Sequence, residues 1–94
     1  MPTIVSGKLR IKSGCRNEFI ERSIHSIELA RKTEGCSDFS VSSDPIDPDR
    51  VNVYEMWVSR KALEGFRNSG TEDDLFSLVE SFDVSEYEIQ ANNT

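Results

Sequence analysis

The feature that most limits the possible folds is the spacing of the apolar residues, which changes several times along the chain. From Thr3 to Ile11 apolar side chains alternate with polar ones, and the same alternation returns more strongly from Arg50 to Trp57. Between these segments, from Cys15 to Thr33, apolar residues recur every three or four positions. Alternation is typical of a half-buried strand, and the longer spacing is typical of a helix that buries one side. The chain therefore combines strands and helices.

The segment with the longer spacing predicts one helix with a buried stripe. The stripe consists of Ile20, Ile24, Ile27 and Ala30, with Phe19 beside it. Glu34-Gly35 follows, and glycine is the residue most often found in the left-handed conformation beyond a helix end. We therefore expect a helix over Cys15–Thr33 that packs on the strands through this stripe.

The remaining segments are recognised from turn residues and shorter alternations. We expect a strand over Cys36–Ser43, a loop over 44–49, a helix from the N-cap Ser59 to Asn68, a helical turn that begins at Thr71, and a last strand over Val84–Gln90. Proline keeps the loop out of a strand ladder, and serine is a favoured N-cap. The buried residues expected after Thr71 are Leu75, Phe76 and Val79.

The resulting order, β-α-β-β-α-β, is that of the ferredoxin-like α+β fold, in which helices cover one face of an antiparallel sheet. A chain of 94 residues suits one domain, so we expect residues 1–94 to form a single domain. Apolar side chains on the other sheet face would be an exposed patch unless something covered them. Because so short a chain buries little surface alone, we expect a homodimer with the two sheets packed face to face.

The charges exclude several classes of partner. The chain has 17 acidic and 11 basic residues, a net charge of −6, and its basic residues are scattered. Nucleic acids and anionic membranes attract clustered basic residues, so we expect neither as a partner. No apolar run approaches the length of about 18 residues that a membrane-spanning helix needs. The first residues also lack the basic and apolar regions of a signal peptide.

The cysteines indicate the compartment. Small secreted domains usually contain several disulfides, whereas this chain has only Cys15 and Cys36, at the two ends of the expected helix. We expect both to be reduced thiols in a cytoplasmic protein. One histidine and two cysteines give no zinc-site spacing, so we expect no metal site.

Three segments together resemble the antibiotic biosynthesis monooxygenase (ABM) family of dimeric α/β-barrel proteins. They are Ser13-Gly14, Glu34-Gly35-Cys36-Ser37-Asp38-Phe39, and Tyr54-Glu55-Met56-Trp57-Val58-Ser59 with Ala62-Leu63 after it. The resemblance implies a ligand pocket between the sheet and the helices. The family contains several kinds of member, so the resemblance leaves the activity open among them. They are cofactor-independent oxygenases of polycyclic phenols or quinols, haem-degrading enzymes, an isomerase of a signal molecule, and members without a known activity.

The chain departs from this family at positions that bear on activity. Phe66 and Thr71 stand where members often have histidines. The first strand has Val5-Ser6-Gly7 where haem-degrading members use an asparagine. The residues of haem degradation therefore do not map onto this chain, and we expect no cofactor.

Glu55 and Trp57 are the first candidates for a functional site. They lie two residues apart on the apolar face of the Arg50–Trp57 strand. Burial on such a face raises the pKa of a carboxyl, which suits Glu55 to accept a proton from a phenolic substrate. Trp57 would be a flat wall for an aromatic ring. The alternatives are a carboxylate satisfied by neighbouring donors and a tryptophan that only fills the core.

Four further residues are weaker candidates. His25, the only histidine, would handle protons if it faced a cleft, but a solvent-facing position is the alternative. Tyr54, Phe66 and Phe39 would line an apolar pocket for a ring-shaped ligand. Core packing is the alternative for the two phenylalanines.

These residues and the resemblance lead to two hypotheses. The first is a cofactor-independent monooxygenase, or a related enzyme, of small aromatic or quinol-like substrates. The second is a non-catalytic dimeric module of the same fold that binds a small ligand or regulates another process. The missing histidines motivate the second hypothesis.

Overall fold

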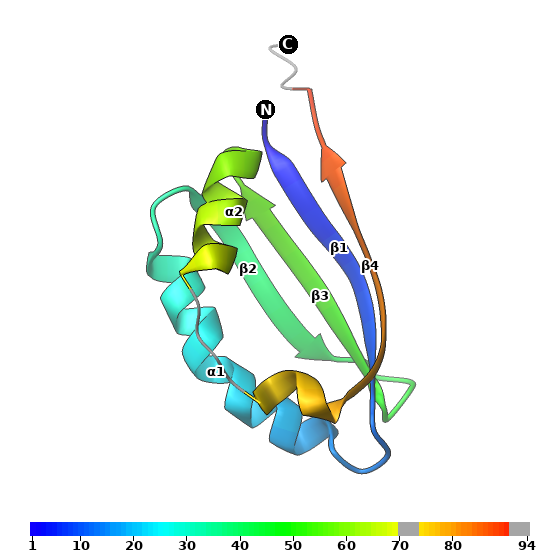
Figure 1. Cartoon of the computed structure of the whole chain (residues 1–94). Coiled ribbons are helices and arrows are strands. Elements are labelled where there is room, and N and C mark those ends of the chain that lie inside the picture. Colours follow the sequence, from blue (N-terminus) through cyan, green and yellow to red (C-terminus); the bar gives the residue numbers. More distant parts are fainter. Residues whose placement is uncertain (70–73, 91–94) are drawn as a thin grey trace.

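The computed structural model describes residues 1–69 and 74–90, which form one antiparallel sheet with its helices on one face (Figure 1). In chain order the elements are β1 (Thr3–Ile11), α1 (Arg16–Lys32), β2 (Cys36–Ser43), β3 (Arg50–Trp57), α2 (Arg60–Asn68), the 3₁₀ helix η1 (Asp74–Leu78) and β4 (Val79–Glu88). The four strands lie side by side in the order β2-β3-β1-β4. The predicted ferredoxin-like β-α-β-β-α-β arrangement is confirmed.

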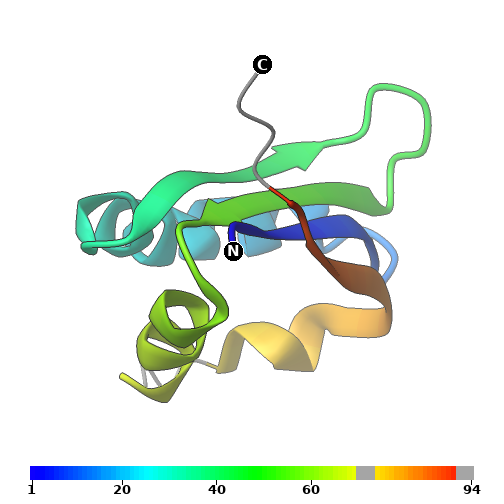
Figure 2. The same ribbon diagram turned by 90° about the horizontal axis from the view of Figure 1, so that it is seen from above.

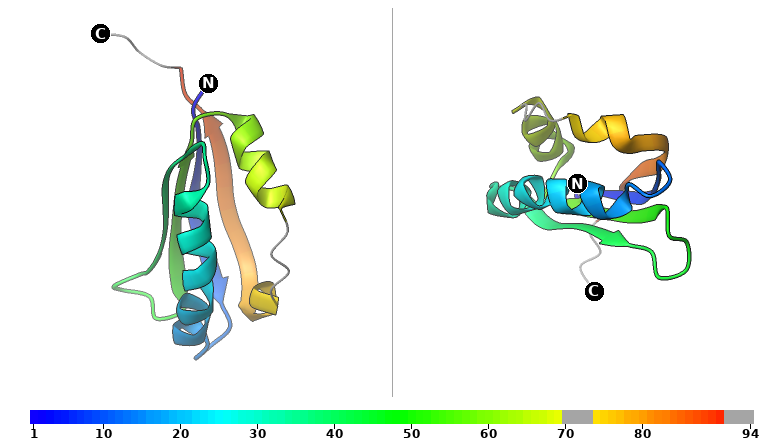
Figure 3. Two further views of the ribbon diagram at one scale, coloured as in Figure 1. Left: turned by 90° about the vertical axis from the view of Figure 1, so that its left-hand side faces the viewer. Right: turned by 90° about the horizontal axis from the view of Figure 1, so that it is seen from below.

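The two helices reach different parts of the sheet. Helix α1 contacts β2, α2 contacts β3, and η1 contacts both α1 and β4. Figure 2 shows η1 leading directly into β4 at one edge of the sheet, and Figure 3 shows α1 and α2 on the same side of the strands. No helix in the described ranges is long and apolar enough to cross a membrane.

The last strand is longer than the sequence predicts. We expected Val84–Gln90, whereas β4 runs over Val79–Glu88 and pairs with β1 along its whole length. Its first half, Val79 to Asp83, does not alternate in sequence, so only the pairing with β1 identifies it as a strand. Phe76 is also a correction, because it is 65% exposed while its neighbour Leu75 is buried. The predicted helix start at Thr71 lies outside the described residues.

The buried side of α1 is shifted from the predicted stripe. Phe19, Ser23 and Ala30 are buried, whereas Ile24 is 47% exposed. Ser23 can be buried because its hydroxyl donates to the carbonyl of Ile20 at 2.7 Å. Ser23, whose hydroxyl is hydrogen-bonded, therefore occupies the buried position in the middle of α1 that we predicted for Ile24.

Helix α2 begins at the predicted cap. Ser59 Oγ accepts a hydrogen bond from the Ala62 N–H at 3.1 Å, and Leu63 is fully buried beneath the helix. Gly35 allows the start of β2 to pass close under α2. It adopts φ +93°, and a Cβ atom there would lie 2.7 Å from the Cβ of Ala62. This contact sets where α2 sits over β3.

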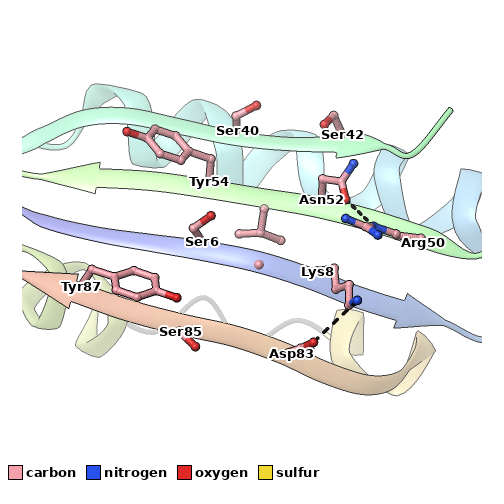
Figure 4. Close-up of a pocket in the computed structure, with 12 residues that line it drawn as sticks. Ser6, Lys8, Ser40, Ser42, Arg50, Asn52, Tyr54, Asp83, Ser85 and Tyr87 are labelled. Atoms are coloured by element: carbon pink, nitrogen blue, oxygen red, sulfur yellow. Dashed lines mark hydrogen bonds and ion pairs between the residues drawn. The ribbon is translucent and has the colours of Figure 1, made fainter.

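The uncovered face of the sheet is mostly polar, contrary to the apolar character that we expected. Strand pairing turns Val5, Leu9, Val51 and Trp57 toward the helices, where they are buried. The outward side chains form two polar rows across the strands, Ser40-Tyr54-Ser6-Ser85 and Ser42-Asn52-Lys8-Asp83 (Figure 4). The chain's own helices therefore cover the apolar side chains of the other face, and the outward row of Ile4, Met56 and Tyr87 is the apolar part of the uncovered face.

Candidate functional site

Three aromatic side chains meet between α2 and the sheet. Phe39 comes from β2, Trp57 from the end of β3 and Phe66 from α2. The ring centroids are 5.3 Å apart for Trp57 and Phe66, 5.9 Å for Phe39 and Phe66, and 6.5 Å for Phe39 and Trp57. These separations are those of directly packed aromatic pairs. Trp57 is fully buried at the centre of this cluster.

Glu55 lies at the side of the aromatic cluster. Its Oε1 accepts a hydrogen bond from the Trp57 indole Nε1–H at 3.0 Å. In the sheet it stands between Val5 of β1 and Phe39 of β2, both buried apolar residues. Burial raises the pKa of the Glu55 carboxyl above its usual value, against the lowering effects of the Trp57 hydrogen bond and the Arg67 charge. Such a carboxylate is a better proton acceptor than an exposed one.

A network of ion pairs joins α2 to β4 next to this carboxyl. Arg60 donates to Glu86 at 2.6 Å and to Glu88 at 2.9 Å. Arg67 donates from Nη1 to Glu86 at 2.8 Å. The hydrogen bond from Arg67, and next the one from Arg60, lower the pKa of Glu86. Glu86 therefore stays ionised more readily, whereas Glu55 accepts protons more readily. Glu55 and Glu86, on the same face of the sheet, thus have different electrostatic environments.

The sequence candidates do not all come together. Glu55, Trp57, Phe39 and Phe66 converge between α2 and the sheet. Tyr54 lies on the opposite, uncovered sheet face (Figure 4). Its hydroxyl is 3.8 Å from the sulfur of Met56. His25 is exposed on α1, two positions after the buried Ser23 and therefore on the other side of that helix.

Sequence reasoning missed Arg60, Arg67 and Glu86. The ion pairs join residues 19 to 28 positions apart in the chain, from a helix to an edge strand. Nothing local marks them, because charged residues on a short helix are ordinary. The one usable signal was the β4 alternation, which places Glu86 and Glu88 on the face that the helices cover.

A hollow lies on the uncovered sheet face, away from the aromatic cluster. Its volume is about 520 Å³, and it is lined mainly by hydroxyl, amide and charged side chains from all four strands (Figure 4). Lys8 and Asp83 form an ion pair of 3.8 Å across it. Tyr54 belongs to this hollow and not to the aromatic cluster around Trp57.

Comparison with known proteins identifies the family to which this chain belongs. Residues 2–77 match the antibiotic biosynthesis monooxygenase family, so the chain belongs to that family, as the sequence motifs predicted. It is 32% identical over 63 residues to an uncharacterised protein from Synechocystis. That match covers 67% of this chain and 43% of the Synechocystis protein, which is less than half of the relative's length.

Solved structures support the fold. A putative antibiotic biosynthesis monooxygenase from Nitrosomonas europaea superposes with a TM-score of 0.83 at 18% identity, over 97% of this chain and all of that one. One from Chloroflexus aurantiacus gives 0.75 at 22% identity, over 100% and 98%. A haem-degrading protein from Mycobacterium tuberculosis gives 0.70 at 17% identity, over the whole of both chains. At these identities the likeness concerns the fold alone.

Proposed function

We propose that this protein is a cofactor-independent monooxygenase of small aromatic or quinol-like substrates, with Glu55 as its proton acceptor. The observation that carries the proposal is the Glu55 carboxyl, half-buried beside three packed aromatic rings and held by the Trp57 indole N–H. Membership of the monooxygenase family adds to it.

In the proposed reaction the substrate supplies the electrons. The O–H bond of a phenol or quinol breaks, its proton moves to Glu55, and the electron pair stays on the substrate. The resulting anion reduces dioxygen. One oxygen atom enters the substrate and the other leaves as water, with all the electrons drawn from the substrate. The protein contributes apolar walls and a proton acceptor shielded from water.

The walls of the proposed site are Trp57, Phe66 and Phe39. A flat substrate ring would pack against the indole and displace the Phe66 ring, which is only partly buried. Such pockets are mainly apolar with a few polar groups, here the Glu55 carboxyl. His25 and Tyr54 stay predictions from the sequence, and the proposed reaction does not use either one.

Oxygen uptake with a panel of hydroquinones tests the proposal. We expect the purified protein to consume oxygen, and Trp57→Phe to reduce the rate about tenfold or more because it removes the N–H that orients Glu55. Phe76→Leu is the matched control, since Phe76 is exposed and lies outside the aromatic cluster. Uptake no faster than the uncatalysed rate with every hydroquinone would overturn the proposal.

Phe66, which stands where members of the family often have a histidine, favours a second candidate, a non-catalytic module that binds a small ligand. Because Trp57 and Leu63 are fully buried, a ligand under α2 would have to displace the partly buried Phe66 ring in either candidate. Ligand binding without oxygen uptake would select this candidate. The first candidate requires both binding and oxygen uptake.

We also propose that two copies pair through the uncovered sheet faces, in the cytoplasm. One row of that face, Ile4 with its strand neighbours Met56 and Tyr87, is apolar or aromatic and gives the pairing a hydrophobic part. Cys15 is the N-cap residue of α1 and Cys36 is the first residue of β2, and both are free thiols, which suits a reducing compartment.

Light scattering tests the dimer. We expect the purified protein to have twice the mass of one chain at micromolar concentration. Ser6→Arg, in the middle of the uncovered face, is expected to shift the protein toward monomers because it places an unpaired charge in the interface. Glu28→Arg on the exposed side of α1 is the control. A monomeric wild-type protein would contradict the proposal.

A further inference from the structure

Two carboxylates face α2 from one row of the sheet. Val5 of β1 pairs with Glu55 of β3 on one side and with Glu86 of β4 on the other. Residues paired in this way point to the same sheet face, and neighbouring strands are about 4.8 Å apart. The backbones of the two glutamates are therefore about 10 Å apart, with the buried Val5 between them.

Arg67 of α2 acts on both carboxylates. It donates to Glu86 at 2.8 Å, and its positive charge also reaches Glu55, whose pKa it lowers. Only Nη1 is engaged in the Glu86 bond. Its side chain is 46% exposed, so the guanidinium has room to move. A guanidinium offers five N–H donors, so Arg67 has further donors for a second acceptor near Glu55.

Arg67 can leave Glu86 without leaving that carboxylate unpaired. Arg60 binds the other oxygen of Glu86 at 2.6 Å and also pairs with Glu88 at 2.9 Å. The network also contains more negative than positive groups. Arg60 pairs with Glu86 and Glu88, Arg67 pairs with Glu86, and the charge of Arg67 also reaches Glu55. A proton transferred from a substrate to Glu55 would move one negative charge onto the substrate oxygen, still within this network.

We infer that Arg67 is the residue that recognises the acidic hydroxyl of the substrate, exchanging Glu86 for the substrate oxygen while Glu55 takes the proton from that oxygen. The inference rests on the proposed function and narrows its substrate class. The substrate O–H bond breaks, a bond forms between that hydrogen and Glu55, and the oxygen keeps the electron pair and accepts a hydrogen bond from Arg67. The site thereby selects phenols and enols over ethers or hydrocarbons of the same shape.

A pair of probes that differ only in the hydroxyl tests this inference. The probes are 2-naphthol and its methyl ether, 2-methoxynaphthalene, with dissociation constants measured by calorimetry. We expect the wild-type protein to bind 2-naphthol about tenfold more tightly than the ether, because a charge-assisted hydrogen bond is lost with the ether. Arg67→Gln is expected to reduce the preference to about twofold or less, and Arg67→Lys to restore part of it.

Lys61→Gln is the matched control. It removes one positive charge from the exposed surface of the same helix and leaves the ion pairs of Arg60 and Arg67 with Glu86 and Glu88 in place. Lys61→Gln is expected to keep the preference for 2-naphthol. The inference is overturned if Arg67→Gln keeps that preference, if Lys61→Gln loses it equally, or if wild-type protein binds neither probe at millimolar concentration. If the wild-type protein prefers 2-naphthol through Arg67 but consumes no oxygen, the proposed monooxygenase activity is rejected and the role of Arg67 in binding the hydroxyl is supported.

Discussion

Replacing Glu55 with Gln is expected to abolish oxygen uptake and, at the same time, to stabilise the fold at neutral pH. The amide oxygen of Gln can still accept the Trp57 N–H, but the side chain cannot take a proton. Loss of a general base typically lowers a rate by about 100- to 10,000-fold, so the initial rate of oxygen uptake should fall by that factor. Glu64→Gln, on the exposed surface of α2, is the control and should keep the full rate.

The gain in stability follows from the direction of the Glu55 shift. Its pKa in the folded protein is raised, mainly by burial, so the folded state binds this proton more readily than the unfolded state. The free energy of unfolding therefore falls as pH rises from the ordinary pKa of the carboxyl through the raised one, and stays lower above it. Removing the ionisable group should increase the free energy of unfolding by on the order of 1 kcal/mol near neutral pH.

Thermal unfolding of the two proteins across a pH series measures this effect. The melting temperature of Glu55→Gln should exceed that of the wild-type protein near neutral pH. The difference should shrink as the pH falls through the raised pKa of Glu55 toward the ordinary pKa of a glutamate carboxyl. A melting temperature below that of the wild type near neutral pH would mean that the ionised carboxylate stabilises the fold, which would contradict its assignment as a desolvated base.

Gly7→Ala is expected to cost the most stability of the substitutions considered. Strands β1 and β4 approach so closely at this residue that a Cβ atom would lie 2.1 Å from the Asp83 carbonyl oxygen and 2.6 Å from the Val84 Cα. Both are backbone atoms of β4, so relief of the clash requires breaking the β1–β4 pairing. We expect a loss of about 3 kcal/mol or more in the free energy of unfolding, measured by urea denaturation.

Gly65→Ala gives the matched control for Gly7→Ala. Gly65 lies within α2, and nothing lies within 4 Å of a Cβ atom added there. Alanine is favoured over glycine in a helix by roughly 0.8–1 kcal/mol, so this variant should be as stable as the wild type or more stable. A Gly7→Ala protein with an unchanged urea midpoint would contradict the close approach of β1 and β4.

Much of the fold could be predicted from the sequence because its signals are local. Alternation over Thr3–Ile11 and Arg50–Trp57 defined two strands with their observed ends, and Ser59 marked the start of α2. The first half of β4 has no such alternation, because its residues from Glu80 to Asp83 are exposed whichever way they point, and its pairing with β1 identifies it as a strand. The exposure of Ile24 likewise depends on how closely Ser23 lets α1 approach the sheet.

The candidate site was predictable only in part, for the same reason. Alternation along β3 placed Glu55 and Trp57 on one face, and the N–H···O bond between them lies on that face. The same alternation puts Tyr54 on the opposite face, so Tyr54 and Glu55 cannot share one cluster. The proximity of Phe66 and Arg67 depends on the position of α2 over the sheet, which long-range contacts such as Gly35 against Ala62 determine.

Labelled dioxygen tests the proposed monooxygenase most directly. The purified protein would be incubated with a hydroquinone that it consumes, under ¹⁸O₂ and with a metal chelator present, and the product would be analysed by mass spectrometry. The proposal predicts one ¹⁸O atom in each product molecule and the other in water, with incorporation lost in Glu55→Gln. Product without ¹⁸O, or equal incorporation by Glu55→Gln, would contradict a monooxygenase that uses Glu55 as its base.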